Sequence, residues 1–224
     1  MVSGQLTAGA NADFLFNLDG TNHRAVCDAG HPPTRAVAFP SPTTGSAVIR
    51  QALHWTCAVA LLIIVRRGEK LPLTSIGIGT SPVTRSIAWS IPLAFICLGV
   101  GLGIALLTHF NGGRSGEALA KLPLWLLVMI VVRAGVVEEL FYRGYAIERL
   151  QAIGLNRYWA ATTPLVIFSL AHWTGGWANI VIALAIGAVL SLFYLWRRDL
   201  VANMVAHCAV DFVGVVLPRL VHHS

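Results

Sequence analysis

The chain has 224 residues, of which 56% are hydrophobic and only 12% are charged. Soluble domains carry about 25% charged residues, so this composition excludes an ordinary soluble domain and predicts an integral membrane protein. The formal net charge of +6 is not gathered in a basic stripe with interleaved aromatic residues, and we therefore expect no nucleic-acid partner.

The beginning of the chain differs from the rest. Residues 1–46 are polar, rich in Gly, Ala, Thr and Pro, and show no helical periodicity. Such a segment has too little apolar surface to bury, so we predict a disordered head. Residues 47–224 are predicted to form a single membrane domain.

Six apolar stretches follow the head, and each is near the roughly 20 residues that cross a 30 Å hydrocarbon core. The first two cover about 47–65 and 87–107. The third starts near 122 and continues past the adjacent glutamates at 138 and 139. The last three cover about 158–173, 177–196 and 200–217. Lipid offers no partner to unpaired backbone groups, so each stretch should be a helix. The predicted fold is an all-α, polytopic membrane helix bundle, with about six transmembrane helices around a polar intramembrane cavity.

Lys and Arg are most frequent in the first, third and fifth loops between these helices. Positively charged loops remain in the cytoplasm. We therefore predict that these three loops are cytoplasmic and that both termini lie on the opposite side of the membrane.

The third stretch carries Glu138, Glu139 and Arg143, although an ion at the centre of a membrane helix costs roughly 2.5–3.5 kcal/mol on insertion. Glu139 and Arg143 are four residues apart and share a helix face, which predicts an ion pair. Glu138 is rotated by about 100° from Glu139, so it can face a cavity and act as a general base. Alternatively, the two glutamates mark only the cytoplasmic end of the helix. Arg133, in the same stretch, also needs a partner.

Two later stretches carry ionisable groups with a companion on the same face. Phe168 and His172 are four residues apart, although a lone histidine near a helix end is more often an interfacial or core residue. Asn203, His207 and Asp211 follow one another at intervals of four. A carboxylate one turn from an imidazole can hold its tautomer; the alternative is a polar seam between helices.

A glutamate and two histidines on different helices fit the activation of water, either directly or on a zinc ion bound by His172 and His207. No HExxH or GxSxG motif is present, and no Ser or Cys has a base at nucleophile spacing. If the third helix ended just after its glutamates, Glu138 and His172 would lie at opposite ends of the bundle. A shared site therefore requires this helix to continue to about Leu150.

These residues resemble, in order, the three motifs of the CAAX-protease and bacteriocin-processing family, also called Abi. The matching motifs are Glu138-Glu139-x-x-x-Arg143, Phe168-x-x-x-His172 and His207-x-x-x-Asp211. The third motif of the family ends in Asn or Asp. The resemblance covers about residues 87–217 and leaves out the head.

The resemblance implies a helical intramembrane endopeptidase. Glu138 would activate the water, His172 and His207 would assist it or bind a metal, and Asp211 would complete the site. The residues that would support this site are Glu139, Arg143, Phe168 and Asn203. Family members have been described both as metalloproteases and as metal-independent glutamate peptidases, so zinc remains an open alternative.

The family also implies partners. Its eukaryotic members cut the last three residues from prenylated CAAX proteins, and bacterial members are linked to bacteriocin maturation or self-immunity. We therefore expect a peptide or lipidated protein substrate, contact with membrane lipid, and a multi-pass location in a bacterial cell membrane. Two alternatives are an inactive binding or bacteriocin-immunity protein of the same fold, and a small proton-coupled transporter whose buried carboxylates relay protons.

Overall fold

The computed structural model describes residues 43–110 and 112–221, except for the side chain of Arg114. The predicted disordered head therefore lies outside the described residues, apart from 43–46. Within the described ranges every regular element is a helix, which confirms the all-α prediction.

The helices begin and end close to the expected apolar stretches. They are α1 (Thr44–Ile63), α2 (Val83–Leu107), α3 (Gly113–Ala120), α4 (Leu124–Arg133), α5 (Glu148–Ala152), α6 (Arg157–Leu170), α7 (Trp177–Arg197), α8 (Leu200–Asp211) and α9 (Leu217–Val221). Helix α1 starts slightly earlier than expected because Thr43 caps it, with its Oγ1 accepting a hydrogen bond from the backbone N–H of Ser46 at 3.2 Å. The short helix α3 was not predicted.

Wide π-helical turns connect several of these elements. They extend α1 to Gly68, join α4 to α5 and join α8 to α9, so that the described residues form seven separate helices. We call the joined unit of α4 and α5, residues 124–152, the long helix. It carries both adjacent glutamates near its middle.

Four helices in the described ranges are long and apolar enough to cross a membrane. They are Thr44–Gly68, Val83–Leu107, Trp177–Arg197 and Leu200–Val221. The other two expected spans do not meet this measure. The long helix has Arg133, Glu138 and Glu139 among its apolar residues, and α6 has only 14 residues. The protein is thus a multi-pass membrane protein with four candidate spans.

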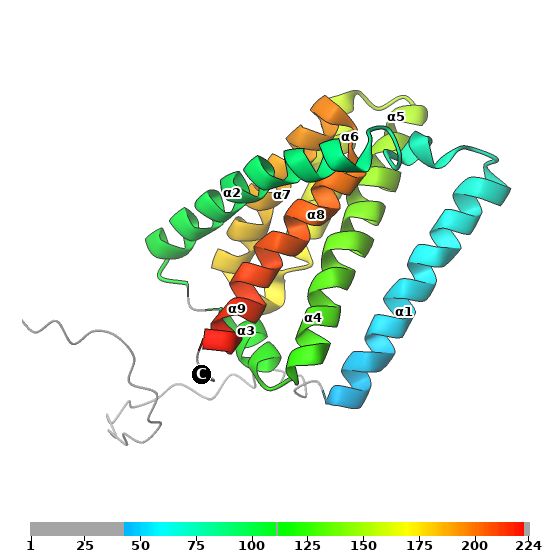
Figure 1. Cartoon of the computed structure of the whole chain (residues 1–224). Coiled ribbons are helices and arrows are strands. Elements are labelled where there is room, and N and C mark those ends of the chain that lie inside the picture. The colour runs from blue at the N-terminus through cyan, green and yellow to red at the C-terminus, as the bar shows by residue number, and fades with distance from the viewer. Residues whose placement is uncertain (1–42, 111, 222–224) are drawn as a thin grey trace, which may run out of the picture. The chain divides into compact units, whose positions relative to one another are not determined.

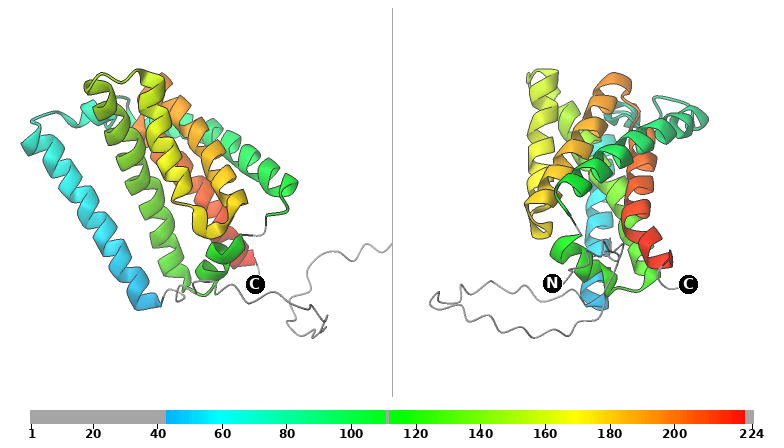
Figure 2. Two further views of the ribbon diagram at one scale, coloured as in Figure 1. Left: turned by 180° about the vertical axis from the view of Figure 1, so that it is seen from behind. Right: turned by 90° about the vertical axis from the view of Figure 1, so that its left-hand side faces the viewer.

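The bundle surrounds the middle of the long helix. Figure 1 shows α2 running obliquely across α7 and α8, and Figure 2 shows α6 beside α7. The first half of the long helix packs on α8 and its second half packs on α6. The approach to α8 is close because Gly135 has no side chain; a Cβ there would collide with Cys208 and with the carbonyl oxygen of Met204. Helix α1 contacts α4 on the other side.

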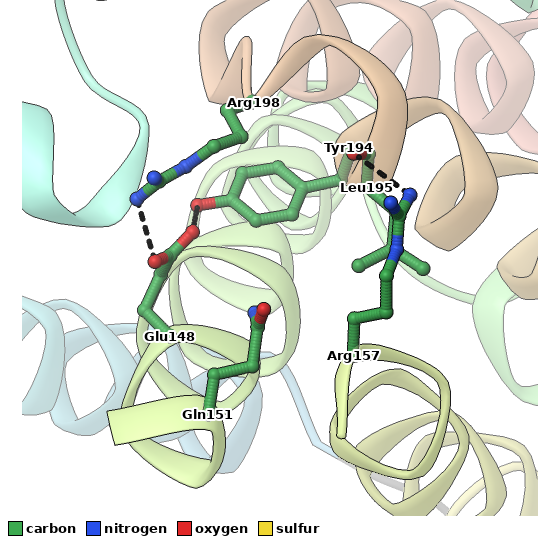
Figure 3. Close-up of a pocket in the computed structure, with 6 residues that line it drawn as sticks. All are labelled: Glu148, Gln151, Arg157, Tyr194, Leu195 and Arg198. Atoms are coloured by element: carbon green, nitrogen blue, oxygen red, sulfur yellow. Dashed lines mark hydrogen bonds and ion pairs between the residues drawn. The ribbon is translucent and has the colours of Figure 1, made fainter. Parts of the chain in front are cut away.

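Ion pairs gather several helix ends at one end of the bundle. Figure 3 shows Tyr194 and Arg198 reaching Glu148 of α5, with distances of 3.0 Å from the Tyr194 hydroxyl and 2.6 Å from the Arg198 guanidinium. Glu69, which follows α1, accepts hydrogen bonds from Arg149. These bonds hold the pKa of the Glu69 carboxyl below its ordinary value. The first, third and fifth loops therefore lie at the same end.

Large apolar side chains remain exposed on the outer helix faces. They include Phe95 and Leu107 of α2, Trp125 of α4, Ile167 of α6 and Leu192 of α7, each more than half exposed. A soluble monomer rarely leaves so much apolar surface in water. These faces are suited to contact with lipid.

Candidate active site

The long helix continues to Ala152, past Leu150, as a shared site required. Its geometry is unusual around the two adjacent glutamates. The segments Ala134–Glu138 and Leu140–Ile147 are both π-helical, with the wider turns that recur at functional sites in helices. Glu138 and Glu139 thus occupy the junction between two wide turns.

Glu139 is fully buried at the centre of a polar network. Its Oε1 lies 2.6 Å from Nη1 of Arg143, which confirms the predicted i,i+4 ion pair. The same oxygen accepts a hydrogen bond from Nδ1 of His207 at 2.8 Å. Its Oε2 accepts one from Nδ2 of Asn203 at 3.1 Å. Two of the polar residues on α8 therefore bind a carboxylate that the sequence paired only with Arg143.

The guanidinium of Arg143 also contacts α7 and the ring of Phe168. Its Nη2 donates to the carbonyl oxygen of Gly187 at 3.3 Å and its Nε donates to Oγ of Ser191 at 3.4 Å, both on α7. Its guanidinium carbon lies 4.6 Å from the ring centroid of Phe168, in cation–π geometry. The glycine provides the necessary space, since a Cβ at Gly187 would lie 2.9 Å from Nη2 of Arg143.

His172 lies just beyond the end of α6, and its ring orientation is determined by its own helix. Its Nδ1 lies 2.8 Å from the carbonyl oxygen of Phe168. A carbonyl can only accept a hydrogen bond, so Nδ1 carries the proton and Nε2 is left with a lone pair in the neutral ring. Nδ2 of Asn179, on α7, donates to the backbone oxygen of His172 at 3.1 Å. Nδ1 of His207 also carries a proton, because the Glu139 carboxylate accepts a hydrogen bond from it.

Three of the predicted site residues line one pocket of about 100 Å³: His172, His207 and Asp211. Nε2 of His207 lies 3.6 Å from Oδ2 of Asp211, a charge interaction rather than a hydrogen bond. The rest of the lining is mainly apolar and consists of Phe168, Asn179, Ile182, Ala183, Ile186 and Val210. The pocket thus combines two imidazoles and a carboxylate with an apolar wall.

Glu138 does not line this pocket, and it is not free, contrary to our expectation. Its Oε1 lies 2.6 Å from Nη1 of Arg133, which identifies the missing partner of that arginine. Nε of Arg133 in turn donates to Oε1 of Gln51, on α1, at 3.2 Å. Glu138 nevertheless interacts electrostatically with His207 and Asp211, so it lies beside the pocket.

The arrangement of donors does not fit a resident zinc ion. Structural and catalytic zinc sites use at least three protein ligands. Within residues 43–110 and 112–221, no group of three or more His, Cys, Asp or Glu side chains is placed to hold a metal. We therefore derive no step through the zinc that His172 and His207 were considered to bind.

Several residues of this network were not identified from the sequence: Gln51, Asn179, Gly187 and Ser191. Gln51 had a signal in the sequence, since it is an amide within an apolar stretch. The roles of the α7 residues depend on the close approach of α7 to Arg143 and His172, for which a single sequence carries no signal.

Residues 120–213 match the family model described as type II CAAX prenyl endopeptidase Rce1-like. This segment includes all the motif residues, from Glu138 to Asp211. No protein of curated function and no solved structure matches the chain.

Proposed function

We propose that the protein is an intramembrane endopeptidase, because residues 120–213 match the Rce1-like family model of type II CAAX prenyl endopeptidases. It hydrolyses a peptide bond with a water molecule that its own carboxylates and imidazoles activate. The observation that carries the proposal is the pocket in which His172, His207 and Asp211 meet, beside Glu138.

The residues divide the work as follows. Glu138 takes a proton from the attacking water as the general base, and returns this proton to the leaving amine when the C–N bond of the tetrahedral intermediate breaks. Nε2 of His172 accepts a hydrogen bond from the same water and orients it. His207 stabilises the negative oxygen of the tetrahedral intermediate, and the nearby Asp211 favours its charged form. Glu139, which binds Nδ1 of His207, holds this ring in position.

The substrate enters from the lipid. The pocket volume of about 100 Å³ is too small to enclose a peptide, so the substrate must reach it from its open side. Ile182, Ala183 and Ile186 of α7 form an apolar wall suited to an aliphatic residue next to the scissile bond. A prenylated CAAX peptide carries both aliphatic residues and a lipid anchor, and is the substrate class that we propose.

Six helices cross the membrane in this proposal. The long helix and α6 are added to the four candidate spans, with the charges of the long helix turned inward. The ion pairs Glu69–Arg149 and Glu148–Arg198 place the first, third and fifth loops at one end, as alternate crossing requires. From the positive charge of these loops we infer that this end is cytoplasmic, and we propose a bacterial cell membrane as the location.

Cleavage of farnesylated CAAX peptides by the purified protein in detergent tests the proposal. Glu138→Gln and His172→Ala should each lower kcat by at least about 10²-fold. Glu69→Gln removes a carboxylate outside the pocket and should keep parental activity. A chelator should leave the rate unchanged. Parental rates in both pocket variants would reject the assignment, and loss with chelator followed by rescue with zinc would replace it with a metalloprotease.

One observation favours a second function, that of a membrane binding or immunity protein without turnover. Oε1 of Glu138 is already occupied by Arg133, as it would be in a protein that keeps the fold but does not cleave. Such a protein would bind the prenylated peptide and leave it intact in the same assay.

A further inference from the structure

Arg133 and Glu138 form an ion pair that depends on the wide turn between them. They are five residues apart, and in a regular α-helix with 3.6 residues per turn their side chains would point about 140° away from each other. In the π-helical segment Ala134–Glu138 the chain needs more residues for each turn, which brings the fifth residue back to the same side. The distance of 2.6 Å between Nη1 and Oε1 is the result.

Helix α1 supports this pair from outside the segment that defines the family. Gln51 is only 5% exposed, although it lies in a helix whose outer side is apolar. Its Oε1 accepts a hydrogen bond from Nε of Arg133 at 3.2 Å. The guanidinium thus donates through Nε to α1 and through Nη1 to Glu138. Residues 120–213, by contrast, contain Arg133 and Glu138 but not Gln51.

The ion pair with Arg133 occupies only one of the two carboxylate oxygens of Glu138. Only Oε1 of Glu138 is bound by Arg133, and within the part of the chain that the structure describes its Oε2 accepts no hydrogen bond. The side chain of Glu138 is still 20% exposed. The charge of Glu138 also acts on His207, Asp211 and Tyr142. One oxygen is therefore fixed while the other can meet a water molecule.

We propose that Arg133 and Gln51 are positioning residues, and that together they hold Glu138 with its free oxygen toward the attacking water. Helix α1 is then part of the catalytic centre, although it lies outside the family segment. This inference rests on the proposed function, in which Glu138 is the base. It predicts that both residues act on the chemical step and that Gln51 acts only through Arg133.

The test is a set of kinetic measurements with the prenylated peptide. Arg133→Gln should lower kcat by about 10²-fold, the usual effect of a misplaced catalytic group, with KM unchanged. Arg133→Lys keeps the charge and should recover part of this loss. Gln51→Leu should lower kcat less, and should have no further effect when combined with Arg133→Gln. Arg50→Gln changes an exposed neighbour on α1 and should match the parent.

The outcomes separate this inference from the function on which it rests. If the parent protein cleaves the peptide and Glu138→Gln does not, but Arg133→Gln keeps the parental kcat, the positioning role is overturned while the proposed function stands. Additive losses in the combined variant would overturn the link through α1, and an effect on KM alone would indicate a role in substrate binding instead. A parent protein that leaves the peptide intact would overturn both.

Discussion

Nδ1 of His207 donates to Oε1 of Glu139, 2.8 Å away, across the contact between α8 and the long helix. The same oxygen is bound by Arg143. The histidine of the third motif is thus oriented by the second glutamate of the first motif, while Asp211 faces its other nitrogen at 3.6 Å. The two adjacent glutamates have different tasks, because Glu139 is enclosed in a network and Glu138 lies beside the pocket.

Loss of the Glu139 charge should destabilise the whole bundle. Glu139→Gln leaves the fully buried Arg143 without its counter-ion, and breaking a buried pair in this way costs about 3–5 kcal/mol. Glu138→Gln is the matched control, since the side chains of Glu138 and Arg133 are 20% and 13% exposed and loss of this ion pair should cost less than loss of the fully buried one. Equilibrium unfolding in mixed micelles of increasing SDS content measures both. Equal losses would contradict the distinction between the two glutamates.

A methyl group at Gly187 should disturb the support of Arg143. The added Cβ of Gly187→Ala would lie 2.7 Å from Cδ1 of Leu165 and 2.9 Å from Nη2 of Arg143. Overpacking of this kind costs about 1–3 kcal/mol. Gly99→Ala in α2 meets no atom within 4 Å and should be neutral or up to about 1 kcal/mol more stable. The same unfolding assay compares the two, and equal stability would show that α7 is free to move away.

Asp211 should tolerate an amide but not an apolar residue. Asp211→Asn keeps a polar side-chain oxygen near Nε2 of His207. Asp211→Leu removes the carboxylate that lies 3.6 Å from Nε2 of His207. Peptide cleavage should therefore remain measurable in the first variant and disappear in the second. Equal activity of the two variants would remove Asp211 from the site.

Stability should decrease in acid through the pair of Glu69 and Arg149. The hydrogen bonds from Arg149 keep the pKa of Glu69 in the folded protein below its ordinary value. The stabilisation is therefore complete above the ordinary pKa of a glutamate and is lost as the pH falls through the lowered value.

Thermal unfolding of the detergent-solubilised protein as a function of pH measures this effect. Glu69→Gln should lower the midpoint at neutral pH and weaken its decrease in acid. Identical pH profiles for parent and variant would show that this partly exposed pair does not contribute to stability, as is the case for many surface ion pairs.

Much of the fold follows from local patterns in the sequence. The apolar stretches predicted the helices well, because backbone hydrogen bonds in lipid must be satisfied within each segment. The sequence predicted about six membrane spans, which is more than the number of helices that qualify in the described residues. Four stretches qualify by length and composition, whereas α6 is short and the long helix carries charges.

The sequence by itself determined which residues share a helix face. The pairing of Glu139 with Arg143 and the spacing of Phe168 from His172 follow from 3.6 residues per turn. Only the tertiary structure decided how the helices meet and where a turn departs from that period. The packing of α8 on the long helix brought His207 to Glu139 as well as to Asp211. A π-helical turn paired Glu138 with Arg133. The packing of α1 added a hydrogen bond from Arg133 to Gln51. A regular period cannot foresee these contacts, because they depend on one inserted turn and on the packing of residues far apart in the chain.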